Sequence, residues 1–142
     1  MEPDNQRRSL GLDIELISSG LGSIKRGNLV YYREIPVGEV TGYKLGNPAD
    51  HVVIFVNIEE RYAGLVSENS RFWNASGIDL KVGLFSGAKV RTDSLEALLA
   101  GGVAFATPEI PPKKLKDGRR FKLYPKVDSE WLDWQPKIKL KE

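Results

Sequence analysis

Short segments of alternating apolar and polar residues, separated by turn residues, constrain the fold of this chain more than any other feature. Leu12, Ile14 and Leu16 alternate with Asp13 and Glu15, which is the period-two pattern of a strand with one buried face. Glycines and prolines interrupt similar segments about every ten residues. Such a series of short strands, without alternating helices, indicates an all-β sandwich or barrel. Further strands are predicted at residues 29–33, 37–43, 51–58, 71–74, 78–84 and 103–107.

The segment Ser94 to Ala100 departs from this β pattern. Leu95, Leu98 and Leu99 have the i, i+3, i+4 spacing of a helical turn, Ser94 can cap its start, and Gly101-Gly102 ends it. Two interpretations are open. The turn packs over one end of the β domain, or its paired leucines project outward, where they would need an apolar partner.

The compact domain is predicted to cover residues 11–109, with a second short helix over residues 60–66. Residues 1–10 are polar and aperiodic, so we interpret them as disordered or as a linker. Residues 110–142 form an appended segment that starts with prolines and basic residues and serves as the link to a following domain. Phe121–Tyr124 is a candidate extra strand in this segment.

Two tryptophans, Trp131 and Trp134, lie among charged residues of the appended segment. They either pack on the domain or contact a neighbouring subunit. Large aromatic side chains seldom stay exposed, so packing is the interpretation we favour.

The composition is that of an ordinary single domain. The chain has 142 residues, a formal net charge of +2, one histidine and no cysteine. The small net charge gives no reason to expect a nucleic-acid partner. No stretch approaches the roughly 18 consecutive apolar residues of a membrane helix, and the first residues do not resemble a signal peptide. The chain is therefore expected to be cytosolic or an excised part of a longer, anchored protein.

The sequence offers little that could support catalysis. His51 stands alone at the start of a predicted strand, and carboxylates without histidine or cysteine form a poor zinc site. No serine lies in a GxSxG motif, and neither of the common glycine-rich phosphate motifs is present. We therefore predict no catalytic residue, no metal and no cofactor. The alternative is an enzyme that uses Asp117, Asp128 or Asp133.

Three ordered blocks resemble known sequences. Residues 27–40, GNLVYYREIPVGEV, resemble the "G-x-x-V-x-x-x-G-x-x-V-G-x-V" opening of MCE (mammalian cell entry) domains. The Tyr-Tyr-Arg form is typical of the paraquat-inducible protein B (PqiB) and YebT (LetB) branch of that family. Residues 69–79, NSRFWNASGID, resemble its "N-T-x-F-W-x-x-S-G-I" segment, and residues 89–108 resemble its "S-L-x-x-L-L-x-G-G-I-x-F-x-T-P" stretch. Together the blocks cover about residues 12–108.

The resemblance implies a fold and a function. MCE domains are small β-barrels, here of about seven strands with a short helical pore-lining loop, and they assemble as homohexameric rings. The implied pore-lining, lipid-contacting residues are Leu95, Ala97, Leu98 and Leu99, and Gly101 and Gly102 would be the hinge of the loop.

The resemblance also implies a setting in the cell. The chain would be one non-enzymatic ring domain of a periplasmic protein that is anchored to the bacterial inner membrane by a helix absent from this fragment. The ring would form part of a hydrophobic channel between the inner and outer membranes. Implied partners are copies of the same chain, further MCE domains, phospholipid or another acyl lipid, and an inner-membrane protein. The alternative is a cell-surface adhesion or host-contact β module.

Overall fold

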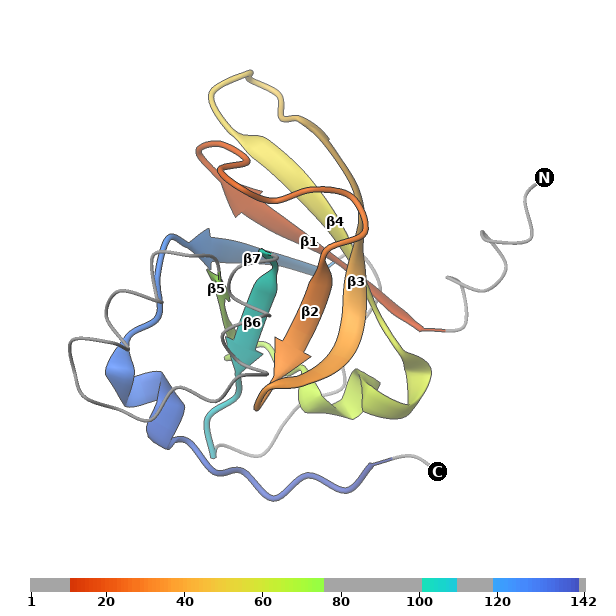
Figure 1. The fold of residues 1–142 in the computed structure, drawn as a ribbon, viewed down its shortest axis with the longest axis vertical. Helices are drawn as coiled ribbons and strands as arrows, with labels where there is room; N and C mark the ends of the chain where they lie inside the picture. The colour runs from red at the N-terminus through yellow and green to blue at the C-terminus, as the bar shows by residue number, and fades with distance from the viewer. Residues whose placement is uncertain (1–10, 76–100, 110–118, 141–142) are drawn as a thin grey trace.

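A closed barrel of seven strands forms the described part of the chain (Figure 1). The computed structural model describes residues 11–75, 101–109 and 119–140. The strand order around the barrel is β1-β4-β3-β2-β6-β5-β7. The prediction of an all-β barrel is therefore confirmed, whereas the strand predicted at 78–84 and the helical turn at 94–100 lie outside the described residues. The strands are β1 (Leu12–Ser18), β2 (Leu29–Tyr32), β3 (Ile35–Leu45), β4 (Val52–Ile58), β5 (Arg71–Asn74), β6 (Val103–Ala106) and β7 (Arg119–Tyr124).

The last strand, β7, closes the barrel from beyond the predicted domain end at residue 109. It runs parallel to β1 on one side and parallel to β5 on the other. Glu15 of β1 stands opposite Arg120 of β7, and the Arg120 Nε donates a hydrogen bond of 2.8 Å to the Glu15 carboxylate. The candidate strand of the appended segment is thus part of the barrel wall.

Aromatic and branched side chains fill the interior of the barrel. The rings of Tyr32, Phe105, Phe72 and Phe121 follow one another across β2, β6, β5 and β7, with centroids 4.8–5.0 Å apart. Branched side chains of β1, β3 and β4, with Val30 of β2, complete the core; along β1 and β4 they occupy alternate positions and so point to one face. Phe72 and Phe105 are almost completely buried, at 0% and 2% exposure. The aliphatic part of this core contains Leu12, Ile14, Leu16, Val30, Val37, Val40, Ile54, Val56 and Ile58.

One end of the barrel is sealed by a short 3-10 helix, η1 (Glu60–Leu65), and a chain of hydrogen bonds. The short helix predicted over 60–66 is therefore confirmed, in a tighter form. Thr107 Oγ1 donates to the carbonyl of Leu65 at 2.6 Å and lies 2.7 Å from Ser70 Oγ, which in turn accepts from the Ser67 amide at 2.9 Å. These buried polar groups are paired, which makes the network stabilising.

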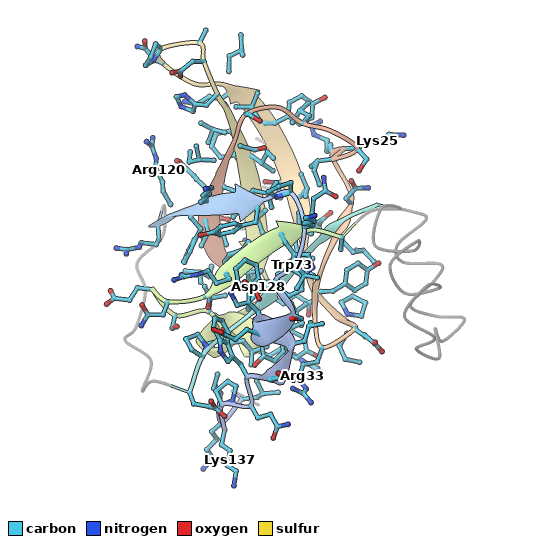
Figure 2. All side chains as sticks on the ribbon, turned by 90° about the vertical axis from the view of Figure 1, so that its left-hand side faces the viewer. Lys25, Arg33, Trp73, Arg120, Asp128 and Lys137 are labelled. Atoms are coloured by element: carbon cyan, nitrogen blue, oxygen red, sulfur yellow. The ribbon has the colours of Figure 1, made fainter. Side chains whose placement is uncertain are left out.

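The C-terminal segment packs on the outside of the barrel. A second 3-10 helix, η2 (Ser129–Asp133), is capped by Asp128, whose carboxylate accepts a hydrogen bond from the Glu130 amide. Trp131 of η2 contacts Trp73 of β5, with ring centroids 5.7 Å apart, and Figure 2 shows Trp73 and Asp128 on the same side of the molecule. Of the two interpretations of the tryptophans, packing on the domain is therefore confirmed for Trp131.

The turn between β2 and β3 has an unusual backbone. Arg33 and Glu34 have φ angles of 52° and 72°, and their flanking residues Tyr32 and Ile35 are paired across the hairpin. Two-residue turns with both φ angles positive favour Asn-Gly, because side chains with a bulky Cβ substituent are strained there. Figure 2 shows Arg33 at the end of the molecule that η1 seals.

We expect the double substitution Arg33→Asn and Glu34→Gly to raise the free energy of unfolding by about 1–2 kcal/mol, since it relieves this strain. Urea denaturation of the variant and the parent chain would measure the gain, provided that the unfolding free energy falls with urea concentration at the same slope in both. An unchanged or lower unfolding free energy would contradict the prediction.

Candidate functional site

The segment that contains the predicted pore loop is attached to the barrel at both of its ends, at a neck formed by Ala75, Gly101 and Gly102. Strands β5 and β6 are antiparallel neighbours, and residues 76–100 connect them. At the start of the connection, the amide of Ala75 donates a hydrogen bond of 2.9 Å to the carbonyl of Gly102. The two ends of the connecting segment are therefore held together on the barrel wall, so the segment begins and ends at one point.

Gly101 and Gly102 form one side of the neck in backbone conformations that favour glycine. Their φ angles are +83° and +152°. A Cβ atom at Gly102 would lie only 2.8 Å from the carbonyl oxygen of Leu29, which is closer than real Cβ contacts allow. Glycine is therefore required at residue 102 both for its backbone angles and for its close approach to β2. This geometry is consistent with the predicted hinge, which stays a prediction.

The neck rests on the segment that leads into β2. A Cβ at Gly101 would lie 3.5 Å from the carbonyl oxygen of Ser23 and 3.7 Å from Asn28 Oδ1. Asn28 braces this segment, because its Oδ1 accepts a hydrogen bond of 2.7 Å from the Lys25 amide and its carbonyl accepts one of 2.8 Å from the Val40 amide. The neck is thus held by a loop that is itself tied to β3.

The ring of Tyr31 lies beside the neck on the outer face of β2. A Cβ at Gly102 would be 3.2 Å from this ring. Partial burial raises the pKa of the Tyr31 phenol above its ordinary value, so the side chain is neutral at physiological pH. Tyr31 therefore presents an uncharged, half-buried aromatic surface next to the point where the loop emerges.

The sequence alone did not single out Ser23, Asn28 and Tyr31 as neighbours of the loop. The only signal was indirect: Asn28 and Tyr31 belong to the first MCE-like block, at residues 27–40, and Gly101 and Gly102 belong to the last. The predicted pore-lining residues Leu95, Ala97, Leu98 and Leu99 lie outside the described residues.

The polar residues considered for catalysis are not gathered into one site in the part of the chain that the structure describes. His51 Nδ1 lies 2.7 Å from the carboxylate of its neighbour Asp50, and this hydrogen bond lowers the pKa of Asp50. Asp128 caps η2, and Asp133 is exposed at its end, whereas Asp117 lies outside the described residues. Within residues 11–75, 101–109 and 119–140, no group of three or more histidine or acidic side chains could hold a metal ion.

No helix in the described part of the chain has the length and apolar character needed to cross a membrane.

The barrel fold agrees with the family that the sequence matches. The MlaD protein family model matches residues 11–98, from the start of β1 into the connection between β5 and β6. The chain belongs to this family of MCE domains.

Curated relatives place the chain more closely. It is 50% identical over 98 residues to the lipophilic envelope-spanning tunnel protein B of Escherichia coli (strain K12), a match that covers 69% of this chain and 11% of that protein. It is also 40% identical over 111 residues to a probable intermembrane transport protein of Haemophilus influenzae, covering 78% of this chain and 12% of the relative. The chain thus spans about a tenth of the length of these relatives.

Proposed function

We propose that this chain is one ring-forming domain of a longer protein that carries lipids between the inner and outer membranes of a bacterium. Membership of the MCE family supports the proposal, as do the names of the two relatives, an envelope-spanning tunnel protein and an intermembrane transport protein. The small share of each relative that the chain covers is consistent with one domain among several. The protein would lie in the periplasm and be anchored in the inner membrane by a helix outside this chain.

The observation that carries the proposal is a filled barrel whose connection between β5 and β6 is held at both ends by the neck. The stacked rings of Phe72 and Phe105 occupy the interior, so a lipid cannot pass through a single barrel. A lipid path built from such domains must lie between copies of the chain. The hydrogen bond between Ala75 and Gly102 fixes the two ends of the connecting segment at one place on the barrel wall.

In this proposal the segment lines the central opening of a homohexameric ring with Leu95, Ala97, Leu98 and Leu99. Each methylene group of an acyl chain gains about 0.8 kcal/mol when it leaves water for an apolar surface. A lining of leucines therefore allows an acyl chain to move without contacting water, and this role needs no nucleophile, base or metal. Gly101 and Gly102 would be the hinge that directs the loop toward the axis.

The proposed partners follow from this arrangement. They are copies of the same chain, phospholipid or another acyl lipid, further MCE domains of the parent protein and an inner-membrane protein. The alternative role, a cell-surface adhesion or host-contact module, is not favoured, because the relatives' names describe a tunnel and a transport protein.

The test is the double substitution Leu98→Asp and Leu99→Asp in the full-length parent protein. We expect lipid transfer between membranes to be lost, because two carboxylates in each subunit would place a ring of charge in an apolar path. The fold should be retained, which circular dichroism of the purified variant would check. The matched control is Leu140→Asp, since Leu140 is an exposed leucine far along the chain from the loop.

Lipid crosslinking gives an independent measurement. A photoreactive amino acid at position 98 or 99 should capture lipid in the native membrane, whereas one at position 140 should not. Normal lipid transfer by the double variant, or equal lipid capture at positions 98 and 140, would contradict the pore role.

A further inference from the structure

The hairpin of β3 and β4 extends beyond the barrel wall and carries exposed apolar side chains. Strand β2 pairs with β3 only from Ile35 to Glu39, and beyond Thr41, whose carbonyl accepts a hydrogen bond from Arg26, β3 is paired, among the described strands, with β4 alone (Figure 1). There Tyr43 and Leu45, two residues apart on one face, are 50% and 66% exposed. They are two of the six large hydrophobic side chains that are exposed in the described part of the chain.

The same part of β3 has an open backbone edge. The Gly46 amide donates a hydrogen bond to the carbonyl of His51, which directly precedes β4. Because residues of an antiparallel strand bond alternately to one neighbour and to the other, the backbone groups of Tyr43 and Leu45 point away from β4. No strand among the described residues pairs with that edge. Open edges with apolar side chains are usually covered by another segment, since they otherwise promote uncontrolled pairing.

Two basic residues flank this edge. Arg26 Nε donates a hydrogen bond of 3.1 Å to the Thr41 carbonyl, which holds its guanidinium against the edge. Lys25 is its exposed neighbour, and Figure 2 shows it in the upper half of the molecule, toward the hairpin. Tyr43, Leu45, Lys25 and Arg26 are called here the hairpin face.

A surface with complementary properties lies on η2. Leu132 is 60% exposed, and it is flanked by the exposed carboxylates of Glu130 and Asp133. Trp131 packs on Trp73, so η2 is fixed to the barrel and its outer side is a stable platform. Leu132, Glu130 and Asp133 are called here the η2 face.

We propose that the hairpin face of one copy of this chain docks on the η2 face of the next copy. The basic and apolar groups of the first match the acidic and apolar groups of the second. Figures 1 and 2 both place the hairpin tip at the upper end of the molecule and η2 in its lower half, so the two faces cannot meet within one chain. The inference rests on the ring proposed above, because a head-to-tail contact between unlike faces is what a ring of identical subunits requires.

The rival arrangement is a symmetric contact between two hairpin faces. It would bring Lys25 and Arg26 of one copy against the same residues of the other, and like charges at an interface oppose association. Charge therefore favours the contact between unlike faces.

The absence of native cysteine makes the proposal directly testable by disulfide trapping. One preparation of the 142-residue chain would carry Leu45→Cys and the other Leu132→Cys. Mixed at high concentration under mild oxidation, the two should form a disulfide-linked heterodimer. Each preparation alone should crosslink at least about tenfold less, because a head-to-tail contact places position 45 opposite position 132. Equal crosslinking of Leu45→Cys with itself would overturn the proposal.

Charge reversal gives the second measurement. Lys25→Glu with Arg26→Glu should raise the dissociation constant of the assembly about tenfold or more in sedimentation velocity, and adding Glu130→Lys with Asp133→Lys should restore it. Leu140→Lys is the control and should leave association unchanged. Failure of the second pair to restore association would overturn the proposal.

The outcomes separate this surface from the proposed function. If a ring forms but the disulfide between positions 45 and 132 does not, the proposed contact between the two faces is wrong and the proposed ring still stands. If the chain forms neither an assembly nor a disulfide at any concentration, the proposed contact between the hairpin face and the η2 face is wrong. The lipid contact of the loop is tested separately, by photocrosslinking at positions 98 and 99.

Discussion

Replacing Phe72 by alanine is expected to lower the free energy of unfolding by about 3–5 kcal/mol. Phe72 is completely buried, and its ring lies 4.8 Å from the rings of both Phe105 and Phe121, so it joins β6 and β7 across the barrel interior. Truncation loses the free energy gained when the ring is transferred from water to the core. It also leaves a cavity that the surrounding side chains of the closed barrel cannot easily fill. Since single domains have unfolding free energies of about 5–15 kcal/mol, the variant would be close to unfolding at 37 °C.

Urea denaturation followed by tryptophan fluorescence would measure this loss, because Trp73 is the next residue along β5. The matched control is Phe55→Ala, since Phe55 lies half-buried on the outer face of β4 beneath the Lys44 ammonium. We expect the control to cost about 1 kcal/mol. A similar loss for both variants would show that the aromatic row does not dominate the stability of the barrel.

Most of the barrel could be predicted from local pattern. The alternation of Leu12, Ile14 and Leu16 determines both the strand β1 and the face that it buries, because a strand exposes alternate residues to opposite sides. The pairing of strands is different, since it depends on contacts between distant residues. The parallel pairing of β7 with β1 and β5 leaves no local signal, and so the sequence pattern predicted the compact domain to end before it.

The buried hydrogen bonds and the contacts on the outside of the barrel could not be predicted from the sequence either. Nothing in the neighbourhood of Thr107 indicates that its hydroxyl reaches the Leu65 carbonyl, which is 42 positions away. Trp131 could be expected to find an apolar surface, but its partner Trp73 looked like any residue of a short strand. Contacts of this kind arise from the closure of the barrel, which brings together segments that are separate in the chain.

At the candidate site, the sequence indicated the change of direction at the two glycines, but it did not indicate which residues surround them. A Gly-Gly pair between a helical pattern and a strand predicts a sharp change of direction, and positive φ angles occur at both Gly101 and Gly102. The role of Leu29 and Tyr31 follows only from the pairing of β2 with β6, which brings the start of β2 against the neck. The change of chain direction can therefore be predicted from the local sequence, whereas the packing around the neck depends on the order of the strands in the barrel.

Substitution of Gly102 by alanine is expected to cost about 2–4 kcal/mol of unfolding free energy, for two separate reasons. Its φ of +152° lies in a region that is almost restricted to glycine, which by itself costs about 1–3 kcal/mol for another residue. The new Cβ would also lie 2.8 Å from the Leu29 carbonyl oxygen, a backbone atom that cannot rotate away. The control is Gly20→Ala, since a Cβ at Gly20 meets nothing within 4 Å. That variant should change stability by less than about 1 kcal/mol.

The neck makes a further prediction about Gly102→Ala in the full-length parent protein. Relief of the clash requires β6 and the end of the loop to move away from β2, so lipid transfer should fall more than in a variant that is equally destabilised at a distant site. Leu16→Ala, at a fully buried position of β1 on the other side of the barrel and with an expected loss of about 2–5 kcal/mol, serves as that comparison. Transfer rates would be measured at a temperature where both variants are folded by circular dichroism. Equal transfer by the two variants would mean that the glycines serve the stability of the barrel and do not direct the loop.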